Sequence, residues 1–255
     1  MRRFLVLTSR HRAPSTNQAL GLLLAFNAGA INAGGFLVLH QYTSHMTGFS
    51  SQLADGLALG QVRLVLTALG ALLAFIAGAA ATALLVNWGR QRRLDSIYAL
   101  PLLCEALLMF PFGLMGAITL GWQTPFTVPL TVLLLSFIMG LQNAVSSKAS
   151  GGRVRTTHMT GNVTDLGMEL GKMLYLNRAR LAAAARGPVR HDRSKLRLTG
   201  GLLAAFVLGG MAGALGFTHL GFVCVVPLAA LLMTVSLPPL WRDLHKLRPL
   251  LMRPR

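Results

Sequence analysis

The amino-acid sequence predicts an all-α, polytopic membrane protein. We expect six transmembrane helices arranged as 3+3 inverted repeats, with two shorter re-entrant or interfacial helices. The first observation is composition: 12% of residues are charged, 53% are hydrophobic and the mean hydropathy is +0.57, whereas soluble domains carry roughly 25% charged residues. The others are a series of long apolar stretches and an internal duplication. Disorder is excluded because disordered chains are poor in apolar residues.

The apolar stretches predict the spans, because a helix needs about 20 apolar residues to cross the hydrocarbon core. Six stretches have this length or come close to it: 19–39, 65–87, 99–120, 126–146, 198–217 and 219–237. Two further segments, 47–62 and 160–176, look helical but are shorter and more polar. Each would reach only about 25 Å, so we do not expect either to span independently.

The basic residues predict the orientation. With six spans and a cytoplasmic N-terminus, all 24 Lys and Arg except Arg63 fall in the cytoplasmic segments 1–18, 88–98, 147–197 and 238–255, as the positive-inside rule requires. An eight-span topology would put Arg90, Arg92 and Arg93 outside. Trp88, Trp122 and Trp241 lie at span ends, where aromatic rings favour the headgroup level.

The domain organisation follows from this topology. We expect a basic cytoplasmic N-terminus, a first membrane repeat, a second membrane repeat and a basic cytoplasmic tail, at residues 1–18, 19–125, 126–237 and 238–255. The second repeat contains the basic cytoplasmic loop 177–197, which we expect to attract anionic lipids at the cytoplasmic face. Nucleic acid is not an expected partner, because no binding module or interleaved aromatic residues accompany the charge.

The duplication joins three matched blocks in the same order. Leu-Leu-Leu-Ala-Phe at 22–26, Gly29 and Asn32-Ala33 match Leu-Leu-Leu-Ser-Phe at 133–137, Gly140 and Asn143-Ala144. The tetrapeptide His-Met-Thr-Gly then follows at 45–48 and again at 158–161, and Phe75 and Gly78 match Phe206 and Gly209. Each copy holds three spans, an odd number, so the second copy starts from the opposite side of the membrane. Inverted repeats of this kind are typical of transporters with a midplane site.

The two tetrapeptides are the main candidate site: His45, Thr47 and Gly48, with His158, Thr160 and Gly161. Threonine would cap the following short helix, and glycine would admit a solute or another backbone. If both short helices re-enter the membrane, their N-termini face each other and offer free N–H donors to an anionic or polar solute. The histidines would gate the site or carry protons. The alternative is that each tetrapeptide is only a capped turn before an interfacial helix.

Polar residues inside the apolar runs are further candidates. Asn32 and Asn143 occupy equivalent positions, where they would bond another helix, line a pore, or both. We expect Asp55, Asp165 and Glu105 to couple protons or ions, because intramembrane carboxylates are costly and usually functional. Glu169 is weaker, since Lys172 would pair with it. Small residues four apart predict close helix packing: Ala25, Gly29 and Ala33; Ser136, Gly140 and Ala144; Gly70, Ala74 and Gly78; Gly209 and Gly213.

Other kinds of chemistry have no signature in the sequence. We find no phosphate-binding glycine loop, no metal-spaced ligand cluster and no recognisable catalytic triad. We therefore expect no enzyme, no cofactor and no metal. Cys104 and Cys224, the only cysteines, each lie in an apolar run, which argues against a fold built on disulfides.

The duplicated tetrapeptides, with Gly-Leu-Gln-Asn-Ala at 140–144 and Arg-Thr-Thr-His-Met-Thr-Gly-Asn at 155–162, resemble the YoaK-like family of bacterial inner-membrane proteins over roughly residues 19–237. The resemblance implies an inner-membrane location, about six spans and a domain of unknown function. Phe49 departs from the Asn that often follows Met-Thr-Gly in that family, while Asn162 keeps it, which implies an asymmetric site.

We therefore expect an integral membrane channel or secondary transporter for a small anionic or polar solute. The alternative is a non-transporting scaffold or regulator that binds lipid or a partner through its basic cytoplasmic loop. Homo-oligomerisation stays open at this point.

Overall fold

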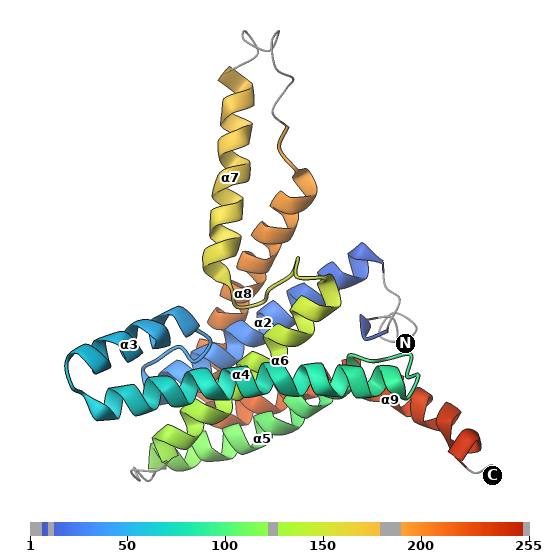
Figure 1. The fold of residues 1–255 in the computed structure, drawn as a ribbon, viewed down its shortest axis with the longest axis horizontal. Helices are drawn as coiled ribbons and strands as arrows, with labels where there is room; N and C mark the ends of the chain where they lie inside the picture. Colours follow the sequence, from blue (N-terminus) through green and yellow to red (C-terminus); the bar gives the residue numbers. More distant parts are fainter. Residues whose placement is uncertain (1–6, 10–12, 122–126, 179–189, 252–255) are drawn as a thin grey trace.

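The computed structural model describes residues 7–9, 13–121, 127–178 and 190–251, and these form a bundle of α-helices (Figure 1). No strand occurs within these ranges. The helices are α2 (Pro14–Leu39), α3 (Met46–Ala58), α4 (Val62–Gln91), α5 (Ala99–Gly121), α6 (Thr127–Ser150), α7 (Met159–Arg178), α8 (Arg193–Leu220) and α9 (Val225–Leu251), with a short 3₁₀ helix, η2 (Gly221–Cys224), between the last two. Trp122 and most of the basic loop 177–197 fall outside the described residues.

The long helices confirm a polytopic membrane protein. Five helical stretches in the described part are long and apolar enough to cross a bilayer, and the last of them, Arg193–His245, contains α8, η2 and α9. Its 53 residues would extend about 80 Å as one straight helix, far beyond the roughly 30 Å of hydrocarbon. The stretch is not straight, because Gly221 adopts φ 62° and ψ −154° and ends α8 there.

Two pairs of helices cross closely on the glycines that the duplication matches. A Cβ on Gly29 of α2 would lie 2.1 Å from the Phe206 carbonyl oxygen of α8, and one on Gly209 would lie 2.0 Å from that of Phe26. The same reciprocal contact joins α4 and α6. A Cβ on Gly78 would lie 2.1 Å from the Phe137 carbonyl oxygen, and one on Gly140 would lie 2.1 Å from that of Phe75. The prediction of close packing at these small residues is confirmed.

The contacts also give the direction of each helix. Leu22 of α2 lies near Gly201 of α8, and Gly34 lies near Phe217, so these two helices run parallel. Gly70 of α4 lies near Leu133 of α6, and Gly78 lies near Phe137, so α4 and α6 also run parallel. In contrast α2 and α6 are antiparallel, since Gln142 donates to the carbonyl of Leu24 and Gly35 contacts Leu135.

A third pair, α5 and α9, completes the bundle. The two helices run antiparallel: Gly113 lies next to Val225 at one end, and the Ser96 N–H donates to Asp243 Oδ2 at 2.8 Å at the other. Phe112, Phe217 and Phe222 pack with tilted or T-shaped ring contacts where α5 meets the α8–η2 junction. This cluster packs against the turn that reverses the chain.

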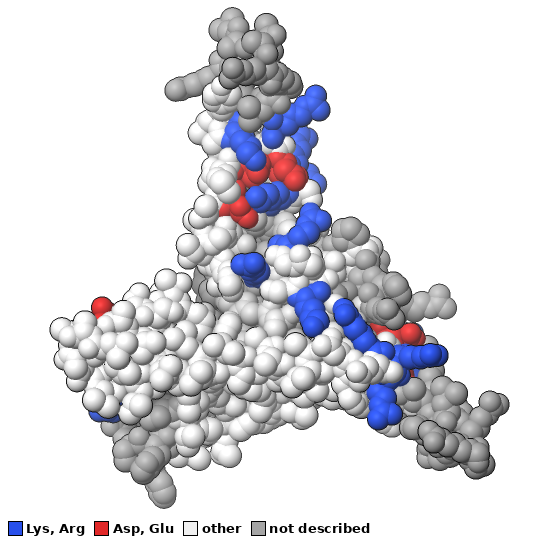
Figure 2. Space-filling model, viewed as in Figure 1, with Lys and Arg blue, Asp and Glu red and all other residues white. Residues whose placement is uncertain are grey.

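Basic side chains gather at one end of the bundle. Figure 2 shows Lys and Arg in a band from the top of the α7–α8 pair to the end where α4 stops, while the end formed by α3 and the start of α4 is almost free of them. Tyr98 at the start of α5 donates to the Lys148 carbonyl near the end of α6, so these helix ends lie together. The predicted clustering of basic residues on one side agrees with this arrangement, with Arg63 at the start of α4 apart from it.

The helix bounds differ from the predicted spans mainly at the C-terminal end. We expected a span to end at 237 and a tail to follow, but α9 continues to Leu251. One side of the continuation is buried, with Leu240 and Asp243, whereas Trp241 is 69% exposed. Its buried side packs where Ser96 precedes α5, a contact that residue-by-residue apolarity does not reveal.

Candidate functional site

Both short helices begin inside the tetrapeptides. Helix α3 starts at Met46 and α7 at Met159. The residue before α3 is His45, with φ −91° and ψ 74°, and no side chain caps this helix. The prediction that Thr47 caps α3 is wrong, because the chain becomes helical one residue earlier and the threonine already lies within the first turn.

Each short helix runs back along the first part of the long helix that follows it. Phe49 of α3 is buried with Ala68 and Ala71 of α4, and Gly56, closer to the end of α3, lies against Val65. The start of α3 therefore lies beside the body of α4, roughly 15 Å from its first turn, and its end lies near the beginning of α4. The two helices are antiparallel.

Helix α7 repeats this arrangement against α8. Glu169 accepts from the N–H of Asp192, directly before α8, and Gly200 further along α8 lies near Leu166, closer to the start of α7. In Figure 1, α7 and the first part of α8 stand together away from the other helices. The start of α7 therefore lies at the level of the α2–α8 crossing, and its end points toward the basic side.

Equivalent asparagines hold the segments that lead into the short helices. Ser44 donates to Asn32 Oδ1 at 3.2 Å, and Asn143 donates to Thr157 Oγ1. Asn143 is the more embedded of the two, since its Oδ1 also accepts from the Thr157 N–H and from Thr156 Oγ1, both at 3.4 Å. Both amides therefore bond the segment before the short helix of their own repeat, whereas the expected alternative was a bond to another helix.

The two tetrapeptide segments meet at one cavity of about 560 Å³. Its polar lining comes from Asn32 and from the two segments: Ser44, His45, Thr157 and Thr160. Its remaining walls come mainly from α2 and α8, as Gly29, Ala33, Phe36, Leu37, Phe206, Val207, Gly210 and Ala214, together with Tyr42 and Met159. Segments distant in the sequence therefore line one shared cavity.

The first turns of α3 and α7 present unbonded backbone donors near this cavity. Bonds to residues 42, 44 and 45 occupy the N–H groups of His45, Met46 and Phe49, which leaves those of Thr47 and Gly48. The imidazole of His45 lies over this turn, since a Cβ on Gly48 would be only 2.6 Å from its Nδ1. Helix N-termini of this kind favour anions and hydrogen-bond acceptors.

Of the predicted solute-binding residues, three line the cavity: Asn32, His45 and Thr160. Asn143 does not line it but donates to Thr157, which does. The lining does not include Thr47, Gly48, His158 or Gly161. Gly48 instead makes room for the His45 ring, while a Cβ on Gly161 would meet nothing within 4 Å. The two tetrapeptides therefore contribute unequally.

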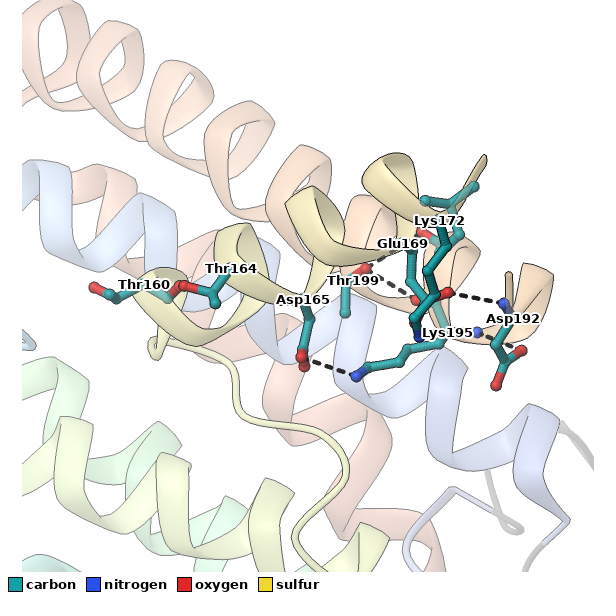
Figure 3. Close-up of polar contacts among 9 residues, drawn as sticks. Thr160, Thr164, Asp165, Glu169, Lys172, Asp192, Lys195 and Thr199 are labelled. Atoms are coloured by element: carbon teal, nitrogen blue, oxygen red, sulfur yellow. Dashed lines mark hydrogen bonds and ion pairs between the residues drawn. The ribbon is translucent and has the colours of Figure 1, made fainter. Parts of the chain in front are cut away.

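The three carboxylates predicted to couple ions lie away from the cavity lining. Asp55 is exposed on α3. Asp165 pairs with Lys195 of α8 at 2.8 Å (Figure 3). Glu105 is fully buried in α5, where its Oε1 accepts from Asn27 Nδ2 at 3.3 Å.

Glu169 forms the second polar contact between α7 and α8. It pairs with Lys172 at 2.8 Å, as predicted, and its other oxygen accepts from the Asp192 N–H at 2.8 Å (Figure 3). These bonds, led by that from Lys172, lower the pKa of Glu169 from its ordinary value. Asp192 in turn caps α8 by accepting from the N–H groups of Ser194 and Lys195.

Sequence reasoning missed two kinds of lining residue. Ser44 and Thr157 are hydroxyl residues directly before each histidine, so the duplication itself carried that signal. No sequence signal marked the aromatic lining residues Phe36, Tyr42 and Phe206, because apolar side chains in apolar spans look alike whether they face lipid, protein or a cavity.

Comparison with known proteins agrees with this architecture. The family model described as "Protein of unknown function (DUF1275)" matches residues 20–237. The UPF0700 transmembrane protein YoaK of Bacillus subtilis (strain 168) is 29% identical over 160 residues, which cover 61% of this chain and 68% of that protein. No solved structure matches the chain. The chain is a multi-pass membrane protein that belongs to the DUF1275 family, and YoaK is similar to it.

Proposed function

We propose that this protein is an inner-membrane channel or secondary transporter for a small anionic or polar solute. Six spans in two inverted repeats, with both termini cytoplasmic, would hold the solute site near the midplane. The observation that carries the proposal is the cavity of about 560 Å³, lined by Ser44 and His45 from one repeat and by Thr157 and Thr160 from the other. A scaffold without transport has no need for such convergence.

The helix pairing supports the inverted repeats. The Phe26–Gly29 segment of α2 crosses Phe206–Gly209 of α8, and the matching segments of α6 and α4 cross by the same glycine-to-carbonyl exchange. The first helix of each repeat thus packs, in parallel, on the second helix of the other. A two-fold axis in the membrane plane relates two such pairs and makes α2 antiparallel to α6, as inverted-repeat transporters require.

The path into α7 supports a re-entrant helix. After α6 the chain passes Gly151 and Gly152, with φ 64° and 83°, and returns along the bundle, where Val154 contacts Gly21 and Leu202. It reaches the level of the α2–α8 crossing at Thr157 and turns back as α7. Irregular backbone at this depth is tolerated where it is buried in protein or lines a cavity.

The donors around the cavity support an anionic or polar solute. Uncapped first turns supply N–H groups and a partial positive charge, and the lining adds hydroxyl, amide and imidazole groups. Within the described residues the lining contains no carboxylate. This combination favours hydrogen-bond acceptors over cations.

The direct test is solute flux into liposomes that contain the purified protein. We would compare small carboxylates, inorganic phosphate and neutral polyols against empty liposomes, each under an imposed gradient. Saturable flux of at least one solute is the expected result. Folded protein that passes none of them would overturn the proposal; loss of binding to anionic vesicles after neutralising the loop 177–197 would then support the scaffold.

A matched pair of variants would tie the flux to the cavity. Thr160→Val removes a hydroxyl from the lining, while Thr164→Val makes the same change one turn later on α7, outside it. A lost hydrogen bond of about 0.5–1.5 kcal/mol predicts a two- to tenfold weaker apparent affinity for Thr160→Val alone. Equal effects of both variants would contradict this position for the site.

A further inference from the structure

The cavity walls differ sharply in chemistry. The polar groups belong to Asn32 and to the tetrapeptide segments, and Ser44 is bonded directly to Asn32. The walls from α2 and α8 are aromatic, aliphatic or glycine. A solute made only of polar groups would leave this second part of the cavity unmatched.

The apolar side of the cavity continues onto the outer surface of the bundle. Phe36 and Leu37 are 37% and 38% exposed, and Val207 is 50% exposed. Val207 lies in the middle of α8, next to Leu208 and in line with Met211, which are 57% and 58% exposed. Exposed apolar side chains in the middle of a span face lipid, so the cavity opens sideways toward the bilayer.

We propose that the solute is an amphiphile with one compact polar or anionic head and a single apolar body, and that it enters from the bilayer. The head binds at the tetrapeptide segments and the body lies against Phe206 and Val207. A volume of about 560 Å³ falls in the range of sites that hold drug-sized molecules. This inference rests on the proposed transport function and narrows its substrate class.

The test is the dependence of binding on chain length. Purified protein in nanodiscs would be titrated with linear carboxylates from acetate to decanoate, with thermal stabilisation as the readout. Each buried methylene contributes about 0.8 kcal/mol, so affinity should rise roughly fourfold per methylene until the cavity is full. Affinity independent of chain length would overturn the inference.

A filled-cavity variant separates the site from general partitioning into lipid. Gly210→Leu places a side chain in the cavity, and its Cβ would meet only the Gly29 carbonyl oxygen, at 3.8 Å. Gly167→Leu is the control, since a Cβ there meets nothing within 4 Å on α7. Ala214→Leu fills the same cavity if Gly210→Leu does not fold. The filled variants should lose the chain-length dependence and the control should keep it.

The outcomes also separate this inference from the proposed function. Flux of short polar solutes without any gain from longer chains would overturn the amphiphile and leave transport standing. Equal chain-length dependence in wild type and both filled variants would likewise show that lipid partitioning, and not this cavity, produces it. Absence of both flux and binding would overturn the two together.

Discussion

Replacing a crossing glycine by alanine tests the packing on which the whole arrangement depends. A Cβ on Gly29 would lie 2.1 Å from the Phe206 carbonyl oxygen and 2.9 Å from the Gly210 nitrogen, whereas real Cβ contacts stay above 3.0 Å. Both neighbours are backbone atoms of α8, so no side chain can turn aside. The two helices would have to separate by about 1 Å, which a close-packed interior resists.

The magnitude follows from a matched control. Gly167→Ala makes the same change within α7, where a Cβ meets nothing within 4 Å. Both variants gain the same helix propensity, about 1 kcal/mol, so their difference isolates the steric cost. Overpacking typically costs 1–3 kcal/mol. We therefore expect Gly29→Ala to be about 1–3 kcal/mol less stable than Gly167→Ala.

The assay is thermal unfolding of both variants in the same nanodiscs, with Gly140→Ala as a third. A Cβ on Gly140 would lie 2.1 Å from the Phe75 carbonyl oxygen, so Gly140→Ala should lose as much stability as Gly29→Ala. At about 2–4 °C per kcal/mol for a chain of this size, the expected loss is several degrees. If either crossing variant matched Gly167→Ala, the close contact at that crossing would be refuted.

Three further variants test the polar contacts. Asn143→Ala should destabilise more than Asn32→Ala, by about 1 kcal/mol or more, because Asn143 binds three groups of the loop and Asn32 binds one hydroxyl; equal melting temperatures would contradict this. Glu105→Gln should melt close to wild type, since an amide oxygen can still accept from α2, whereas a large loss would mean that the charge itself is needed. The lowered pKa of Glu169 means that its carboxylate stabilises the α7–α8 contact at neutral pH, and that this contribution is lost only as pH falls below the ordinary glutamate value of 4.5. A spin-label distance between α7 and α8 should therefore stay constant down to that pH, and Glu169→Gln should remove the transition below it. A change in this distance between pH 7 and 5 would contradict a lowered pKa of Glu169.

The sequence predicted the helices well because a bilayer leaves few choices. Apolar length alone placed the bounds of all the long helices to within about six residues, except that α9 runs past 237 to Leu251. The crossings were also predictable, since small residues such as Gly29 and Gly140 stood at equivalent points of two copies and adjoining backbones require them there. Repetition supplied the information that a single span lacks.

The candidate site was predictable only in part. The duplicated tetrapeptides pointed to the two segments that meet at the cavity, but not to which of their side chains line it. His45 lines it and His158 does not, although their sequence contexts match. The apolar walls were invisible for a different reason: Phe36 and Phe206 differ from lipid-facing residues only in what lies beside them, which is a tertiary property.

The two short helices are attached to their neighbours by different kinds of contact. Phe49 buries α3 against Ala68 and Ala71 of α4, an apolar contact that exposure to water or lipid headgroups would weaken. Asn162 occupies the equivalent place in α7, and α7 meets α8 through the ion pair of Asp165 with Lys195 and through Glu169. Water at the basic side can replace the partly exposed ion pair of Asp165 with Lys195 at little net cost, so this contact holds α7 to α8 less firmly than the apolar contact holds α3 to α4. If the proposed transporter has two re-entrant helices, this difference predicts that α7 separates from its partner more readily than α3.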